Sequence, residues 1–158
     1  MESSYKSYIK RYFVVLLLDS EEEYSSLIEK LSEYLLQKSR DAIAYHNRGL
    51  AYLEMGNEKG LKDIERSISI DGNRKEPYKV LGLFWERNLD LKQALAYFTK
   101  TIEADVNDAK NYRCRASVQE ALGDLDSAIS DLNKAIELEP TFEYTIKLRD
   151  KLQSRASS

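Results

Sequence analysis

The chain has 158 residues, of which 42% are hydrophobic and 32% charged, and its net charge is −3. This length is typical of one domain with a sizeable core, and the mild acidity lacks the basic stripe of a nucleic-acid-binding protein. A single cysteine, Cys114, excludes an internal disulfide and a cysteine metal cluster. We therefore expect one domain over residues 1–158, in a reducing compartment, the cytoplasm.

The first segment joins basic residues to an apolar run that extends from Tyr12 to Leu18 and is stopped by Asp19. A membrane span needs roughly 20 apolar residues, so this run is too short to cross a bilayer. The acidic "SEEE" that follows offers no small-residue cleavage site, which argues against a signal peptide. We predict a buried helix at residues 5–18, although "FVVLLL" also has the composition of a strand.

The next helix is predicted from Ser20 to about Lys38. Ser20 and Glu23 have the spacing of a capping box, in which each side chain satisfies a free backbone N–H group. Leu27, Leu31 and Tyr34 then recur on one helical face. Together with the preceding segment, this helix forms a degenerate helix pair at residues 5–40.

The rest of the chain is an internal repeat. "AKNYRCRASVQEALGDLDSAISDLNKAIELEP" aligns without a gap on "KEPYKVLGLFWERNLDLKQALAYFTKTIEADV", with matched residues 34 positions apart. An earlier segment, "AIAYHNRGLAYLEMGNEKGLKDIERSISIDG", aligns on "KEPYKVLGLFWERNLDLKQALAYFTKTIEADV", with matched residues 33 positions apart. The chain therefore contains three units, at residues 42–72, 75–108 and 109–142.

Each unit is predicted to be an antiparallel helix pair. In the second unit, Tyr78, Leu81, Gly82 and Trp85 share one face of a helix, and a turn at "NLD" separates them from a second helix. Asp90 and Asp124 have the position of N-caps for the second helices, and Asn57 that of the first unit's cap. Small residues at matched positions (Gly82 with Ala116, Ala94 with Ala128) let the two backbones approach closely, so a larger residue would destabilise by roughly 1–3 kcal/mol.

A last helix is expected at residues 143–154. It would cover the apolar side of the final unit with Tyr144, Ile146, Leu148 and Leu152.

This pattern resembles the tetratricopeptide repeat (TPR) family. The family's aromatic, Leu-Gly, Tyr, Ala, Phe, Ala and Pro positions are occupied in the second unit by Tyr78, Leu81, Gly82, Trp85, Ala94, Phe98, Thr101 and Val106. Arg48 and Arg115 depart from it at the Leu position, which we expect to weaken packing there. The resemblance implies an all-α fold: a right-handed superhelix (solenoid) of antiparallel helix pairs with three clear repeats, a degenerate N-terminal pair and a C-terminal capping helix.

Motifs for catalysis or metal binding are weak. His46 has no metal-ligand partner at a suitable spacing, and "GNEKG" lacks the strand and the Lys-Ser/Thr of a phosphate loop. Cys114 has arginines on both sides, but a small residue within a helix is the simpler interpretation. We therefore expect no enzyme activity, no catalytic residue, no cofactor and no metal.

The resemblance implies that the first helices of the pairs line a concave groove, with a protein or peptide as the ligand. Carried over by register, the candidate groove residues are His46, Asn47, Leu50, Lys79, Leu83, Arg87, Lys110, Arg113 and Lys147. Lys110, Arg113 and Lys147 make the C-terminal end of this groove basic, so we expect an acidic side chain or a peptide C-terminus there. For any single one of these residues, an ordinary solvated helix face is the favoured interpretation, because charge is the default there.

Chaperone-binding members of the family hold a C-terminal carboxylate with a fixed set of Lys, Asn and Arg residues. In the register of the three units these positions are His46, Leu50, Val80, Lys110 and Cys114, and only Lys110 matches. The sequence does not support this carboxylate clamp.

The sequence leads to one predicted function and one alternative. The first is a non-catalytic interaction module or scaffold, which binds a peptide or partner protein and neither nucleic acid nor membrane. The alternative is a structural protein that forms a homodimer through the apolar segment "YKSYIKRYFVVLLL". Partner, process and oligomeric state are not encoded in a recognisable motif.

Overall fold

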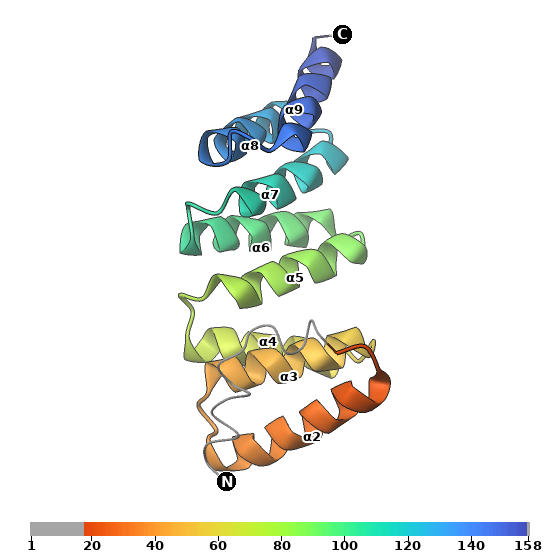
Figure 1. Cartoon of the computed structure of the whole chain (residues 1–158), viewed down its shortest axis with the longest axis vertical. Coiled ribbons are helices and arrows are strands. Elements are labelled where there is room, and N and C mark those ends of the chain that lie inside the picture. Colours follow the sequence, from red (N-terminus) through yellow and green to blue (C-terminus); the bar gives the residue numbers. More distant parts are fainter. Residues whose placement is uncertain (1–17, 158) are drawn as a thin grey trace. The chain divides into compact units, whose positions relative to one another are not determined.

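A computed structural model describes residues 18–157. This part of the chain consists of helices without strands, so the all-α prediction is confirmed for it (Figure 1). The predicted helix at 5–18 lies outside the described residues. The helices are α2 (Glu21–Gln37), α3 (Ala42–Glu54), α4 (Lys59–Ile70), α5 (Lys75–Arg87), α6 (Leu91–Ala104), α7 (Ala109–Ala121), α8 (Leu125–Leu138) and α9 (Glu143–Ala156).

Backbone contacts divide the chain into two compact units, Met1–Pro77 and Tyr78–Ser158. From here on, the first and the second unit are these two parts of the chain, and the sequence repeats are called helix pairs. The first contains α2, α3 and α4, and the second contains most of α5 together with α6 to α9. The single domain over residues 1–158 stays a prediction.

Helix α2 begins where the sequence predicts. The Ser20 hydroxyl accepts a hydrogen bond from the Glu23 N–H at 3.3 Å. The Glu23 carboxylate accepts one from the Asp19 N–H at 3.0 Å, which lowers the pKa of Glu23. The return bond of the capping box therefore goes to the residue before the N-cap.

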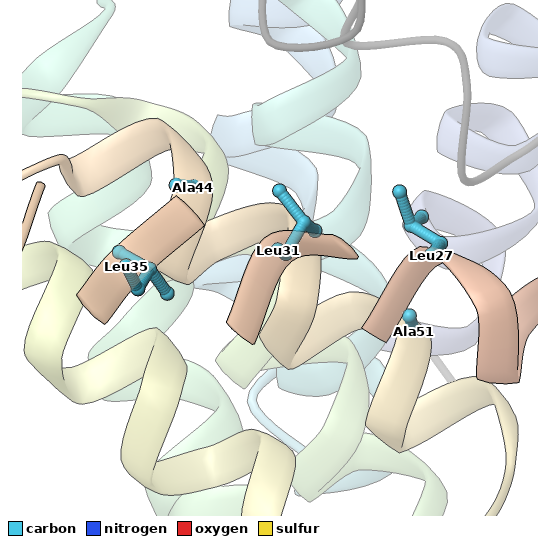
Figure 2. Close-up of a cluster of buried hydrophobic side chains, with 5 residues drawn as sticks. All are labelled: Leu27, Leu31, Leu35, Ala44 and Ala51. Atoms are coloured by element: carbon cyan, nitrogen blue, oxygen red, sulfur yellow. The ribbon is translucent and has the colours of Figure 1, made fainter. Parts of the chain in front are cut away.

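The core of the first unit starts with three leucines on successive turns of α2. Leu27, Leu31 and Leu35 are buried and meet Ala44 and Ala51 of α3 (Figure 2). Because both alanines are small, the leucine side chains fill the space between the two helices.

Helices α3 and α4 form an antiparallel pair with two glycines at their crossing. A Cβ atom on Gly60 would lie 2.4 Å from the Gly49 carbonyl oxygen, so the two backbones are in direct contact. At the end of the pair, the Ser67 hydroxyl donates to the Ala42 carbonyl at 2.6 Å, which joins the last turn of α4 to the first turn of α3. The close approach predicted for the small residues is thus present in this pair.

The second unit repeats this arrangement twice. A Cβ on Gly82 of α5 would lie 2.8 Å from the Phe98 ring of α6. Ala116 of α7 and Ala128 of α8 are buried in one cluster. The predicted N-caps Asp90 and Asp124 are confirmed, because Asp90 accepts from the Gln93 N–H and Asp124 from the Ser127 N–H, each at 3.1 Å. The predicted cap Asn57 is wrong: the N-cap of α4 is Glu58, and Asn57 lies one residue earlier, where its side chain accepts from the Lys59 N–H at 3.0 Å.

The arginines that replace the family leucine are held by carboxylates. Arg48 makes a two-pronged ion pair with Asp63 at 2.7 and 2.8 Å, and Arg115 makes the same pair with Asp131 at 2.7 Å through both nitrogens. The expectation of weakened packing is therefore wrong at these positions, because each guanidinium connects the two helices of its pair.

A third bond from each of these arginines reaches the preceding helix. Arg48 donates to the Ser32 hydroxyl at 3.1 Å, and Arg115 donates to the Thr99 hydroxyl at 3.3 Å. The same polar contact thus joins successive helix pairs within each unit.

The turn between the two helices of each pair contains one residue with positive φ. Two of these residues are glycines, Gly56 and Gly123, with φ of 68° and 82°. The third is Leu89, with φ of 61° and a side chain that is 83% exposed. A side chain at such a φ strains the backbone, which glycine would not.

Helix α9 covers the last pair, but not with all of the predicted residues. Leu152 is fully buried against α7 and α8, whereas Tyr144 is exposed, so its predicted packing role is wrong. Arg149 donates to the Asn133 side-chain oxygen at 3.1 Å, in the manner of Arg48 and Arg115. Its Nε nitrogen donates to the Asp150 carboxylate at 2.6 Å, so the carboxylate partner of this arginine is the adjacent residue on α9.

Candidate functional site

The exposed face shared by α5 and α7 contains most of the predicted groove residues of the second unit. Leu83 and Arg87 are exposed on α5, and Lys110 is exposed on α7. The Ser117 hydroxyl of α7 donates to the Glu86 carboxylate of α5 at 3.3 Å, which joins the two helices across this face. We call these residues, together with Lys79 and Cys114, the α5–α7 face.

Cys114 shows that the cations of this face lie close together. Burial raises the pKa of its thiol; the nearby charges of Lys79, Lys110 and Arg113 act in the opposite direction, and the Glu86 carboxylate acts in the same direction as burial. Because burial is the largest influence, the thiol stays protonated at neutral pH and is not an activated nucleophile. The charges that act on it come from both α5 and α7, so the structure brings together three of the predicted groove cations.

Two of these three cations are uncommitted. The ammonium groups of Lys79 and Lys110 make no hydrogen bond or ion pair with any residue between 18 and 157. Charged groups in this state keep their full capacity to bind an anionic partner.

Arg113, in contrast, is engaged by neighbouring side chains. It donates to the Glu139 carboxylate at 2.7 Å, and its guanidinium carbon lies 4.6 Å from the centre of the Phe142 ring. The basic end of the predicted groove is therefore less cationic than the sequence suggests. Lys147 is likewise paired with Glu143 at 3.0 Å, but both side chains are largely exposed, so this pair is weak.

The three candidates in the first unit differ from the expectation of an exposed face. His46 and Asn47 are 2% and 4% exposed, and Leu50 packs against the core between α2 and α3. Burial lowers the pKa of His46 to about 4, although the Glu76 carboxylate acts in the opposite direction. A neutral, buried imidazole of this kind serves packing and not the recognition of an anion.

A pocket in the first unit was not foreseen from the sequence. It lies between the end of α2, the start of α3 and the segment after α4, and its charged lining residues are Lys38, Arg40, Asp41, Asp71 and Arg74. Both signs of charge are present, and Asp41 already accepts bonds from the Tyr34 hydroxyl and the Ala44 N–H. The pocket therefore has no single ligand chemistry.

Two further features of the described chain bear on function. Among residues 18–157, no three His, Cys, Asp or Glu side chains gather as metal ligands do. Within the same residues, no helix has the length and apolar character needed to cross a bilayer.

The aromatic pair beside Arg113 is the functional candidate that sequence reasoning missed. Phe142 and Tyr144 are 45% and 65% exposed, with ring centres 6.3 Å apart in an edge-to-face arrangement. The sequence contains one indication of this pair. Phe142 lies 34 residues after the N-cap Asp108, so an aromatic residue occupies the position of a capping residue.

The helix pairs, their 34-residue period and their glycine and alanine crossings define a helical-repeat protein. The family model for the tetratricopeptide repeat matches residues 115–142, which span the second half of α7 and all of α8. The chain therefore contains a tetratricopeptide repeat, and its all-α fold is TPR-like.

Relatives and solved structures agree with this assignment. Residues of this chain are 37% identical over 75 positions to a tetratricopeptide repeat protein 36 homolog of Nematostella vectensis, covering 48% of this chain and 41% of the relative. They are 30% identical over 85 positions to Hsp70-Hsp90 organizing protein 1 of Glycine max, covering 54% and 15% respectively. The chain thus spans less than half the length of either relative.

Two solved structures share the fold. A crystal structure of MamA protein superposes with a TM-score of 0.72 at 18% identity, covering 84% of this chain and 75% of that one. The first TPR of Spaghetti (RPAP3), solved with the HSP90 peptide SRMEEVD, superposes with a TM-score of 0.67 at 18% identity, covering 74% and 94%. At these identities the likeness shows the fold alone.

Proposed function

We propose that this chain is a non-catalytic protein-interaction module whose α5–α7 face binds an acidic peptide segment. The observation that carries the proposal is the pair of uncommitted ammonium groups of Lys79 and Lys110 on two adjacent first helices. Leu83, exposed on the same face, adds apolar contact area, and Arg87 extends the positive charge along α5.

The relatives support the class of ligand. The RPAP3 structure contains a peptide that ends in Glu-Glu-Val-Asp, and the organizing proteins are named for Hsp70 and Hsp90. Opposite charges across an interface increase the association rate and select the partner, so a segment with several carboxylates suits two free lysines.

The mode of binding differs from the carboxylate clamp of chaperone-binding relatives. Of the five clamp positions, only Lys110 has the required residue type, and His46 is buried and neutral. The proposal therefore concerns acidic side chains along an extended segment and does not require a free C-terminal carboxylate.

Fluorescence anisotropy tests this proposal with a labelled Ser-Arg-Met-Glu-Glu-Val-Asp peptide and its neutral version, in which Gln and Asn replace the acidic residues. We expect the acidic peptide to bind more tightly and its affinity to fall as salt screens the charges. Lys79→Glu with Lys110→Glu should weaken binding about tenfold or more, because two attractions become repulsions.

A control variant separates this local effect from a general change in net charge. Lys62→Glu with Lys92→Glu makes the same change on the exposed sides of α4 and α6 and should shift the affinity less than about twofold. Equal losses in the two double variants would contradict a site on the α5–α7 face.

The alternative, a homodimer formed through the apolar N-terminal segment, involves residues that the structure does not describe. No observation on residues 18–157 favours it over the interaction module. Light scattering over a concentration series distinguishes the two, because a constant monomer mass contradicts self-assembly.

A further inference from the structure

Helix α9 begins with a residue that does not cap it. Phe142 is at the N-cap position and its side chain offers no hydrogen bond, whereas Asp108 and Asp124 cap α7 and α8. A missing cap costs about 1 kcal/mol, and Asp108 is the residue that matches Phe142 in the 34-residue period. Glu58 at the start of α4 likewise makes no side-chain cap bond, so the exposed ring of Phe142, and not the missing cap, distinguishes this position.

The Phe142 ring is fixed in place at the protein surface. It contacts the Tyr144 ring edge to face, and the Arg113 guanidinium lies over it. Arg113 is itself held by the Glu139 carboxylate at 2.7 Å. Because its neighbours hold the ring, a ligand that covers it loses little side-chain entropy of the protein, which favours binding.

The aromatic pair continues from the α5–α7 face. Arg113 is one turn after Lys110 on α7, and it contacts Phe142 on its other side. The surface thus changes along α7 from an uncommitted ammonium group to two exposed rings. Exposed aromatic residues beside cations are typical of interface hot spots.

We propose that Phe142 and Tyr144 form an aromatic subsite, which takes an aromatic or large aliphatic side chain of the acidic peptide bound at the α5–α7 face. The inference rests on the proposed function, since it assigns a second contact to the same ligand. Carboxylates of the segment lie near Lys79 and Lys110, and an apolar residue beside them covers the two rings.

Charge complementarity supports this occupant over a second copy of the chain. Arg113 and Lys147, on either side of the two rings in the sequence, are paired with Glu139 and Glu143, so the uncommitted positive charge of this surface comes from Lys110 and Lys79. A segment that combines carboxylates with an apolar side chain satisfies both parts of this surface, whereas a repeated copy of the same surface places like charges together.

The test uses two labelled peptides, acetyl-Glu-Asp-Phe-Glu-Asp and the same peptide with Ala in place of Phe. Their affinities are measured by anisotropy for the full chain and for the double variant Phe142→Ser with Tyr144→Ser. We expect the wild-type chain to prefer the Phe peptide about tenfold. The double variant should lose this preference, to less than about twofold, and keep its affinity for the Ala peptide.

The variant is designed to fold. Serine at position 142 provides the N-cap that α9 lacks, so α9 should be retained or stabilised, as circular dichroism and thermal unfolding will report. Leu122→Ser removes another exposed apolar side chain, in the turn between α7 and α8, and serves as the matched control. It should leave the preference for the Phe peptide at about tenfold.

The outcomes separate the two proposals. A double variant that retains the tenfold preference overturns the aromatic subsite and leaves the acidic-peptide site intact. Affinities for both peptides that are unchanged by Lys79→Glu with Lys110→Glu overturn the proposed function instead. A wild-type chain that binds neither peptide contradicts both, and a dimer mass lost on substitution of Phe142 and Tyr144 identifies the rings as a self-contact and overturns the subsite.

Discussion

Replacing Leu89 with glycine is expected to stabilise the second unit, because this residue has the backbone conformation that glycine adopts freely. A φ of 61° costs a residue with a Cβ atom about 1–2 kcal/mol. Glycine offsets part of this gain, since its greater freedom in the unfolded chain costs about 0.5–1 kcal/mol. The Leu89 side chain is mostly exposed and contributes little burial. The net expectation is an increase of about 0.5–1 kcal/mol in the free energy of unfolding.

Urea unfolding followed by tryptophan fluorescence measures this change at the correct place. Trp85 is the only tryptophan in the sequence, and its carbonyl accepts from the Asp90 N–H at 3.0 Å across the same turn. Leu89→Ala is the matched comparison, because it removes the outer side chain and keeps the Cβ atom that causes the strain. The reverse substitution, Gly123→Leu, should destabilise by about 1 kcal/mol, since Gly123 has a φ of 82°.

The difference between the alanine and glycine variants decides whether the reasoning is correct. If Leu89→Ala is as stable as Leu89→Gly, backbone strain is not the cause and the exposed side chain itself is unfavourable. If both variants are less stable than the wild type, Leu89 makes a stabilising contribution that its exposure does not suggest.

Three further predictions concern stability. His46→Gln should make the first unit less sensitive to acid. The folded-state pKa of His46, about 4, lies below the ordinary 6.5, so the free energy of unfolding of the wild type falls by up to about 3 kcal/mol as pH drops from 6.5 to 4. Thermal unfolding at several pH values compares the variant with the wild type. Gly60→Ala should destabilise by about 1–3 kcal/mol despite alanine's higher helix propensity, because its Cβ would meet the Gly49 carbonyl; urea unfolding that shows a gain contradicts the close crossing. Arg115→Leu should lower the free energy of unfolding by about 3 kcal/mol, because it leaves the Asp131 carboxylate unpaired. Adding Asp131→Tyr should recover part of this loss, as a double-mutant cycle will measure.

The double variant Arg115→Leu with Asp131→Tyr introduces the residue pair that the chain already has at the equivalent positions of another helix pair. Leu81 and Tyr97 are at the positions in the second helix pair that match Arg115 and Asp131 in the third. An apolar pair and an ion pair therefore occupy equivalent positions within one unit. A double variant no more stable than Arg115→Leu alone would show that the surroundings of the third pair require the charges.

The period was sufficient to predict the helix pairs and their crossings. Small residues 34 positions apart predict a close approach, and Gly82, Ala116 and Ala128 are at such crossings in the structure. The caps Asp90 and Asp124 were also predictable, because an N-cap depends only on its own turn. Local patterns of this kind need no knowledge of distant partners.

The interaction partners and the burial of long side chains could not be predicted in the same way. Arg113 is in register for an open face, but Glu139, 26 positions further on, binds it. His46 is on a helix face that the register makes accessible, and the structure buries it. Such outcomes depend on which residues a flexible side chain meets, and the repeat pattern does not specify them.

Asp150 limits how an array of this kind can change in length. It lies 34 positions after Ala116, at the site where the first helices of all three pairs have glycine or alanine. A following helix would have to bury its carboxylate at a backbone crossing, and the carboxylate already bonds to Arg149. Duplication of a helix pair upstream of α9 preserves every crossing, whereas growth beyond α9 first requires a small residue at position 150.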